Sequence, residues 1–265
     1  MVARTAPLNR RTEEEPLNRR IEEAPSNRRI EEASLNAWPA LHQMLFDGWV
    51  LRFARGFTKR ANSVTPLYPG SQPIEEKVRF CENLYARERL QSVFRITDDA
   101  ALAPLDRCLA GRGYRRADPT QVLSAPVAAG SRSPRWSLLT RKEWLDAYAA
   151  LTGLPAKLLP LHGAILNAIR TECAHAALVD GGDPLACGLG VVERGLVGLF
   201  DIATHPAHRR QGLGAELVEG LLAWGRERSA ATAYLQVGEN NAPARSLYAK
   251  LGFAECYRYW YRIGD

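Results

Sequence analysis

The sequence predicts an α+β fold in which a mixed, mostly antiparallel sheet is flanked by helices. The first observation is a set of three apolar runs separated by two short glycine-containing turns, which is typical of antiparallel strands. These runs are residues 174–180, 184–192 and 196–204. The second is an apolar face at helical spacing, formed by Leu213, Leu217, Leu221 and Trp224. The third is a pair of further strand-like segments, residues 234–237 and 257–263.

A basic turn joins the third strand to the predicted helix. Pro206 ends the strand, and Gly212 and Gly214 follow just before the helix. The first N–H groups of a helix have no partner within the helix, and the helix dipole adds positive charge there, so phosphate binds readily. The glycines permit close backbone approach, and Arg209 and Arg210 can bind phosphate oxygens through their forked guanidinium groups. The turn is therefore predicted to bind an anion.

Two common nucleotide-binding motifs do not fit this turn. No Gly-Lys-Ser/Thr follows it, as a Walker A loop requires, and Leu217 stands where a Rossmann turn has its third glycine. Residues 209–214 instead match the signature Gln/Arg-x-x-Gly-x-Gly/Ala, and residues 240–253 match Asn-x-x-Ala-x-x-Leu-Tyr-x-x-x-Gly-Phe. Over residues 136–263 the chain thus resembles the GNAT superfamily of N-acetyltransferases. The resemblance implies a GNAT-like acyl-CoA N-acyltransferase fold, with acetyl-CoA as co-substrate.

The resemblance also implies which residues hold the cofactor. The strand end would pair through its backbone with the pantetheine arm, and the turn would bind the pyrophosphate. The implied residues are Ala203, Thr204, His205, Arg209, Arg210, Gln211, Gly212, Leu213, Gly214, Ala215 and Glu216. We expect His205 and His208 to be surface loop residues rather than bases. Asn241 matches an asparagine that contacts the cofactor, and asparagine also favours helix N-caps.

Transfer of an acetyl group to nitrogen requires a proton acceptor for the amine and a proton donor for the thiolate. Tyr248 matches the tyrosine that donates a proton to the CoA sulfur in GNAT enzymes; the alternative is a core tyrosine on an amphipathic helix. The usual glutamate base is replaced by Gln236, which cannot take a proton. We therefore predict Asp201 as the base, because a carboxylate buried in an apolar run would have a raised pKa. Asp201 could instead fix a neighbouring strand, and water could serve, assisted by Glu193 or Glu239.

The rest of the chain is interpreted as three segments. Residues 1–36 contain nine-residue units beginning at Pro7, Pro16 and Pro25, and we expect a charged, disordered tail or short helical turns linked at prolines. Residues 37–124 have the order helix, strand, helix and Gly-Tyr, which mirrors the catalytic domain, residues 136–265. We interpret 37–124 as a degenerate GNAT-like half in a tandem arrangement. It has no Gly-x-Gly turn, so one cofactor per chain is predicted. Residues 125–135 are the expected linker.

Composition excludes several classes of function. The net charge of +6 is spread along the chain without a nucleic-acid-binding motif, so we expect no nucleic acid partner. No run of apolar residues is long enough to span a bilayer, and the beginning of the sequence has no signal-peptide core. The five cysteines lack metal-ligand spacing, which indicates free thiols in the cytoplasm and no metal site. We expect a monomer or homodimer.

The acceptor is not encoded in a motif. The first hypothesis is acetyl transfer to a small-molecule or amino-acid-like amine by direct attack in a ternary complex. Two alternatives stay open: a CoA-binding or regulatory module with weakened catalysis, which Gln236 suggests, and an acetyltransferase acting on protein amines. Consumption of the thioester across a panel of amines distinguishes them.

Overall fold

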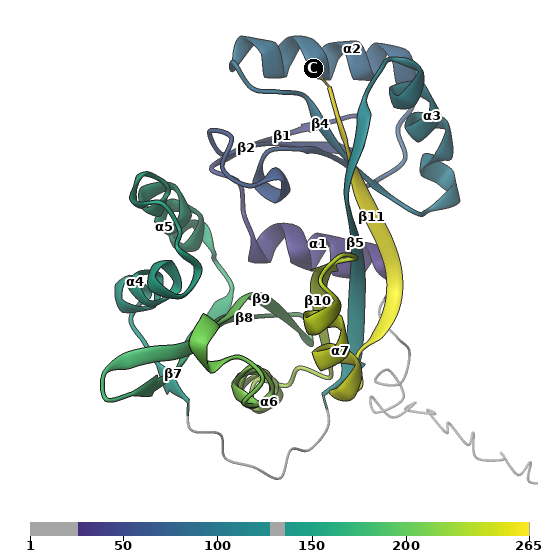
Figure 1. The fold of residues 1–265 in the computed structure, drawn as a ribbon. Helices are drawn as coiled ribbons and strands as arrows, with labels where there is room; N and C mark the ends of the chain where they lie inside the picture. The colour runs from purple at the N-terminus through teal and green to yellow at the C-terminus, as the bar shows by residue number, and fades with distance from the viewer. Residues whose placement is uncertain (1–25, 128–135, 265) are drawn as a thin grey trace, which may run out of the picture.

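The computed structural model describes residues 26–127 and 136–264. Within these ranges, eleven strands form one sheet in the order β1-β2-β3-β4-β11-β5-β10-β9-β8-β7-β6 (Figure 1). The strands are β1 (His42–Phe46), β2 (Trp49–Phe53), β3 (Val64–Pro66), β4 (Val93–Thr97), β5 (Arg115–Pro126), β6 (Ser137–Leu138), β7 (Glu172–Asp180), β8 (Asp183–Glu193), β9 (Leu196–Thr204), β10 (Thr232–Gly238) and β11 (Ala254–Ile263). The α-helices are α1 (Asn27–Ala37), α2 (Ile74–Arg87), α3 (Ala103–Gly111), α4 (Arg141–Thr152), α5 (Leu159–Ala168), α6 (Leu213–Glu227) and α7 (Ala242–Lys250).

The two halves repeat one order of elements. In each half an antiparallel meander is followed by helix, strand, helix and strand: α2, β4, α3 and β5 in the first half, and α6, β10, α7 and β11 in the second. This confirms the predicted α+β fold with a mixed sheet and a second GNAT-like half. The N-terminal half also contains β1 and a short 3-10 helix, η2 (Lys59–Ala61), which carries Arg60.

The last strand of each half is inserted into the sheet of the other half. β11 lies between β4 and β5, and β5 lies between β11 and β10. The predicted domain boundary after residue 124 is therefore wrong, because it cuts β5. Ala125 and Pro126, which we assigned to the linker, pair with Ala233 and Thr232 of β10. Residues 128–135 of the predicted linker lie outside the described residues.

Helices cover both faces of the sheet in the C-terminal half. On one face α6 packs against β8, where Gly188 and Gly190 leave space for the side chains of Leu217 and Leu221. On the other face lie α4 and α5, and the buried Trp144 indole Nε1 of α4 donates hydrogen bonds to the carbonyl oxygens of Ala176 and Gly188 (3.2 and 3.1 Å). In the described part of the chain, no helix has the length and apolar character needed to cross a membrane.

The first described helix corrects the predicted tail. α1 is formed largely by the third nine-residue unit, begins at the N-cap Ser26, and lies between the two halves (Figure 1). Ile30, Ala33 and Ala37 are buried along one face of the helix. The carboxylate of Glu31, also buried, pairs with the guanidinium of Arg95 and accepts a hydrogen bond from the Tyr257 hydroxyl. Residues 26–36 thus form the N-cap and most of a helix whose buried face belongs to the core, rather than a solvated tail, while residues 1–25 lie outside the described residues.

This packing predicts that truncating Ile30 destabilises the whole fold. Ile30→Ala should lower the free energy of unfolding by about 2–5 kcal/mol, since it leaves a cavity at a fully buried position. Denaturant unfolding followed by tryptophan fluorescence measures the change. Arg28→Ala, at an exposed position on the same helix, is the control and should have a smaller effect. Equal stabilities for Ile30→Ala and wild type would show that α1 does not belong to the cooperative core.

Candidate active site

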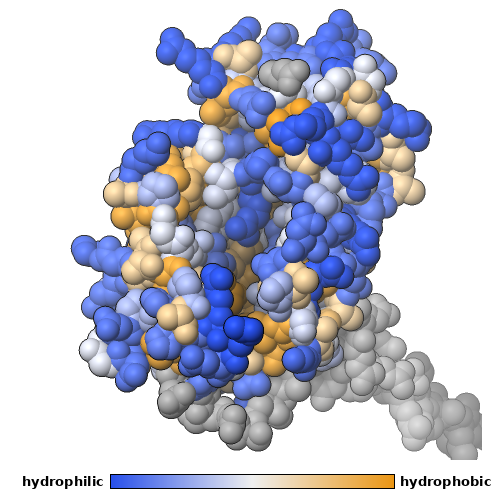
Figure 2. Space-filling model, viewed as in Figure 1, coloured by the Kyte–Doolittle hydropathy of each residue, from blue (hydrophilic) through white to orange (hydrophobic). Residues whose placement is uncertain are grey.

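A cavity of about 280 Å³ opens where the parallel strands β9 and β10 separate. Their pairing runs from Leu196 to Leu199 and from Thr232 to Leu235, and the strand ends beyond it diverge. Figure 2 shows this face of the molecule hollowed between the side that carries α4 and α5 and the side that carries α7. The lining residues are Arg60, Thr120, Leu199, Phe200, Asp201, Ile202, Gln236, Val237, Gly238, Asn241, Ala244, Tyr248 and Tyr259.

The end of β9 offers a free backbone edge to this cavity. Ala203 and Thr204 pair with Cys187 and Ala186 of β8 on one side, whereas the ladder to β10 has already ended on the other. An extended ligand could therefore hydrogen-bond to β9 as an added strand. His205 follows as the N-cap of the 3-10 helix η5 (Pro206–His208), and its Nδ1 accepts a hydrogen bond from the Ala207 N–H (3.3 Å).

The basic turn ends at the N-terminus of α6. Arg210 and Gly212 both have positive φ (+62° and +84°), and Gly212 is the N-cap residue. It has no side chain to bind the first N–H groups of α6, so the donors of Leu213, Gly214 and Ala215 keep their capacity for an anion. A Cβ at Gly214 would lie 3.2 Å from the Leu247 side chain, so this glycine allows α6 and α7 to pack closely. Arg209, Arg210 and Gln211 are exposed around the turn, and Glu216 lies in the first turn of α6.

Helix α7 places Tyr248 and Asn241 in the wall of the cavity. Asn241 is the N-cap of α7, where its Oδ1 accepts a hydrogen bond from the Ala244 N–H (3.2 Å), and it also lines the cavity. Tyr248 is only 7% exposed, and its ring packs edge-on against Phe253. Among the described residues its hydroxyl has no hydrogen-bond partner, and burial raises its pKa to about 12. The hydroxyl therefore stays protonated and is able to donate.

Asp201 lies on the opposite face of the sheet, beside α5. Its side chain is 7% exposed, and its Oδ2 is 2.9 Å from Nε2 of the buried His162, although the two groups are not aligned as a hydrogen bond. The His162 ring is enclosed by the rings of Trp38, Phe57, Trp144 and Tyr148. On its other side the Asp201 Oδ1 is 3.9 Å from Nη2 of Arg60.

The remaining candidate bases lie in different surroundings. The Gln236 Oε1 accepts a hydrogen bond from the Tyr259 hydroxyl (3.0 Å) in the cavity wall. Glu193 accepts hydrogen bonds from Asn36, and Glu239 pairs with Arg258, and neither glutamate lines the cavity. Two residues near Asp201 were not predicted, Arg60 and His162. Both come from distant parts of the sequence and belong to no motif.

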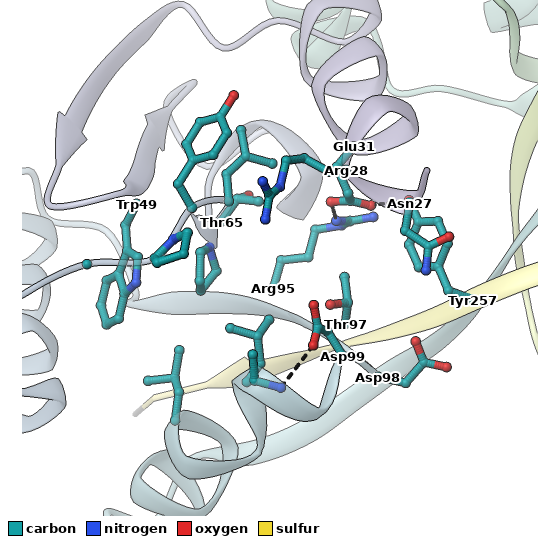
Figure 3. Close-up of a pocket in the computed structure, with 18 of the residues that line it drawn as sticks. Asn27, Arg28, Glu31, Trp49, Thr65, Arg95, Thr97, Asp98, Asp99 and Tyr257 are labelled. Atoms are coloured by element: carbon teal, nitrogen blue, oxygen red, sulfur yellow. Dashed lines mark hydrogen bonds and ion pairs between the residues drawn. The ribbon is translucent and has the colours of Figure 1, made fainter. Parts of the chain in front are cut away.

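A second and larger cavity, of about 900 Å³, lies where β3 and β4 separate in the N-terminal half (Figure 3). Arg95 extends from β4 toward Glu31 of α1 there, and Tyr257 lies beside them (Figure 3). The predicted site residues Tyr248 and Asp201 line the smaller cavity and not this one.

The loop before α2, which corresponds to the basic turn before α6, already holds an anion from this chain. The Asp47 carboxylate accepts hydrogen bonds from the Ser71 and Gln72 N–H groups (2.9 and 3.0 Å) and pairs with Lys77 (2.9 Å). These backbone donors, Ser71 first, hold the pKa of Asp47 well below its usual range. The N-terminal half thus places its own carboxylate at this position, whereas the C-terminal half has Gly212, which has no side chain to bind the first N–H groups of α6.

Fold and site together define an acetyltransferase of the GNAT class. The chain belongs to the family described as "Probable histone acetyltransferase Rv0428c C-terminal", whose model matches residues 25–262. Over 235 residues it is 28% identical to the uncharacterized N-acetyltransferase YobR of Bacillus subtilis, covering 86% of this chain and 94% of YobR. A GCN5-related N-acetyltransferase from Kribbella flavida has a TM-score of 0.66 at 17% identity, covering 92% of this chain and 96% of that one.

A shorter similarity concerns one part of the chain. Over 57 residues, 22% of this chain, it is 47% identical to the [Ribosomal protein bS18]-alanine N-acetyltransferase of Escherichia coli, of which 38% is covered. The family and the fold confirm the predicted membership of the GNAT superfamily and the assignment as an acetyltransferase. GNAT acetyltransferases generally use acetyl-CoA.

Proposed function

We propose that this protein transfers the acetyl group of acetyl-CoA to the amine of a small molecule by direct attack in a ternary complex. The observation that carries the proposal is the cavity between β9 and β10, where Tyr248 from one face of the sheet and Asp201 from the other line the same space. A proton donor and a proton acceptor on opposite sides are what acyl transfer from a thioester to an amine requires.

The chain's own groups suit acetyl-CoA as the co-substrate, which supplies an acetyl group activated as a thioester. The unpaired edge of β9 at Ala203 and Thr204 would bind the pantetheine amides. The N–H groups of Leu213, Gly214 and Ala215, with Arg209 and Arg210, would bind the pyrophosphate. Asn241 would contact the cofactor through its Nδ2 group, since the capping hydrogen bond uses only Oδ1.

Proton transfer would divide between the two sides of the cavity. The Asp201 carboxylate takes a proton from the acceptor ammonium, which leaves a neutral amine to form the C–N bond. The C–S bond then breaks, and the Tyr248 hydroxyl donates its proton to the departing sulfur. The nitrogen, which has two protons after Asp201 has taken the first, loses one of them as the amide forms; this proton restores the Tyr248 hydroxyl, and Asp201 releases its own proton to water. A pKa of about 12 keeps the hydroxyl protonated at neutral pH until that step.

The size of the cavity favours a small acceptor over a protein. A volume of about 280 Å³ lies just below the range of about 300–1,000 Å³ that is usual for small-molecule sites. The family description names histones, and the Escherichia coli relative is named for a ribosomal protein alanine, so protein amines form the competing hypothesis. A module with weakened catalysis is the other alternative. Thiol release from acetyl-CoA with small amines and with peptides tests all three.

The first prediction concerns the basic turn. Gly212→Asp should abolish acetyl-CoA binding, because its carboxylate would repel the pyrophosphate and compete for the N–H groups, as Asp47 does in the other half. Isothermal titration should give one site of roughly micromolar affinity for wild type, within the usual range for enzyme substrates, and none for the variant. Gly182→Asp is the matched control: Gly182 also has positive φ (+98°) and open surroundings, but lies in the β7–β8 turn. Wild-type stoichiometry near two would contradict the single site.

The second prediction concerns Tyr248. Tyr248→Phe keeps the ring packed against Phe253 but removes the proton donor, so turnover should fall by roughly 10²-fold or more. Acetyl-CoA affinity and melting temperature should change little, since the hydroxyl has no hydrogen-bond partner among the described residues. Thiol release at saturating acetyl-CoA, with a melting curve for both proteins, measures this. Retention of at least about half of the turnover would rule Tyr248 out as the acid.

The third prediction concerns Asp201. Asp201→Asn should lower turnover by roughly 10²–10⁴-fold, because an amide cannot accept the amine proton. Asparagine tolerates positive φ as well as aspartate does, so the backbone at +49° should not be strained by the change. Unchanged acetyl-CoA affinity would localise the loss to the acceptor side. At high pH the free amine predominates without the help of a base, so the turnover of Asp201→Asn should recover there if Asp201 is the proton acceptor. A loss of turnover that is the same at every pH would contradict this role.

A further inference from the structure

Arg60 lies in the cavity wall, and the N–H groups of its guanidinium make no hydrogen bond with the described residues. Its guanidinium lies over the rings of Trp38 and Phe200, at 4.8 and 5.8 Å from their centroids. Among the described residues its side chain donates no hydrogen bond, and it is 28% exposed at the cavity. Aromatic stacking of this kind fixes the plane of the guanidinium but leaves the N–H groups along its edge free for a planar anion.

The backbone beneath Arg60 is held in place by buried polar side chains. Arg52 donates a hydrogen bond to the Arg60 carbonyl oxygen (2.5 Å). Asn62 accepts from the Ala54 and Gly56 N–H groups (2.7 and 2.9 Å) and donates to the carbonyl oxygens of Phe57 and Thr58. The position of Arg60 is therefore set by the fold, although the residue comes from the half that binds no cofactor in our proposal.

Arg60 and Asp201 form a pair of opposite charges on the acceptor side of the cavity. Their closest atoms are 3.9 Å apart, the outer limit of an ion pair, whereas His162 comes within 2.9 Å of the same carboxylate. Arg60 is thus poorly explained as a simple counter-charge for Asp201. Because Arg60 and Asp201 lie so close together, a ligand that binds both must carry its ammonium and its anion close to each other. An α-amino acid, with both groups on one carbon, meets this condition, whereas a ligand with the two groups at the ends of a long chain does not.

We propose that the acceptor is an α-amino acid or a close analogue, whose carboxylate binds the Arg60 guanidinium while its amine faces Asp201. The proposal rests on the acetyltransferase function proposed above and narrows its substrate class. It places the specificity-determining residue in the N-terminal half. It also disfavours protein amines, because both a lysine residue and the N-terminal residue of a protein have an amide, and not a carboxylate, attached to the α-carbon.

The substrate test compares matched acceptors. Thiol release from acetyl-CoA is measured with the twenty common L-amino acids and with the α-carboxamide of each, which differs only in lacking the negative charge. We expect kcat/KM for the preferred amino acid to exceed that of its amide by roughly 10- to 100-fold, as for a hydrogen-bonded charge pair. Amides or N-terminal peptides that react as well as the free acids would overturn the proposal. Absence of thiol release with every amine tested would remove the proposed function itself, and this inference with it.

The variant test separates recognition from architecture. Arg60→Gln should raise KM for the amino acid by roughly 10- to 100-fold and leave KM for the amide unchanged; Arg60→Lys, which keeps the charge but not the fork, should show a smaller rise. Lys59→Gln is the control, since this neighbouring cation is exposed and paired with Asp118 (2.7 Å). The affinity for the N-acetylated amino acid product, measured by titration, does not depend on turnover. We expect this affinity to be lower in Arg60→Gln than in wild type. If both acceptors lose activity equally in Arg60→Gln, the arginine is structural and the proposal fails.

Discussion

The pairing of β5 with β11 is the interaction on which the rest of the structure depends. Each strand ends one half of the chain yet lies within the sheet of the other: β5 pairs with β10, and β11 pairs with β4. The halves cannot separate without breaking ladders on both sides of this seam. As a consequence, Arg60 from the first half and Tyr248 from the second line one cavity at a fixed separation.

Buried charges hold α1 against the same seam. Arg52 donates to the carbonyl oxygens of Leu35, Trp38 and Arg60, and burial lowers its pKa to about 10, which still leaves it charged at neutral pH. Arg95 pairs with Glu31 and lies over the Tyr259 ring. A charge buried without a partner would be costly, so these contacts favour one position of α1 over others. The same contacts set the place of Trp38, on which the Arg60 guanidinium stacks.

The parts of the fold that the sequence predicts correctly are those encoded locally. The meander of β7, β8 and β9, the basic turn and helices α6 and α7 follow from runs and spacings within a few residues. Helix α1 was missed for two reasons. The nine-residue unit that forms most of it repeats a polar pattern, and Arg95, the ion-pair partner that compensates for the burial of Glu31, is distant in the sequence. His162 and Arg60 were missed for the same reason: their meaning depends on Asp201, to which no local pattern connects them.

The bulge at Asp201 explains how a single strand lines the cavity from both faces of the sheet. Regular alternation along β9 would place Asp201 on the α6 face with Leu199, opposite to Phe200. Instead one extra residue lies between the pairs Leu189–Phe200 and Cys187–Ala203, and Asp201 takes a positive φ of +49°. Phe200 and Asp201 therefore share the face that carries α4 and α5, while Thr204 returns to the face of the basic turn. The bulge also prevents β10 from pairing further, because a strand that bends away cannot continue its ladder. One local distortion thus separates the strands, aims the carboxylate at the side that carries α4 and α5, and leaves the backbone edge beyond it unpaired with β10.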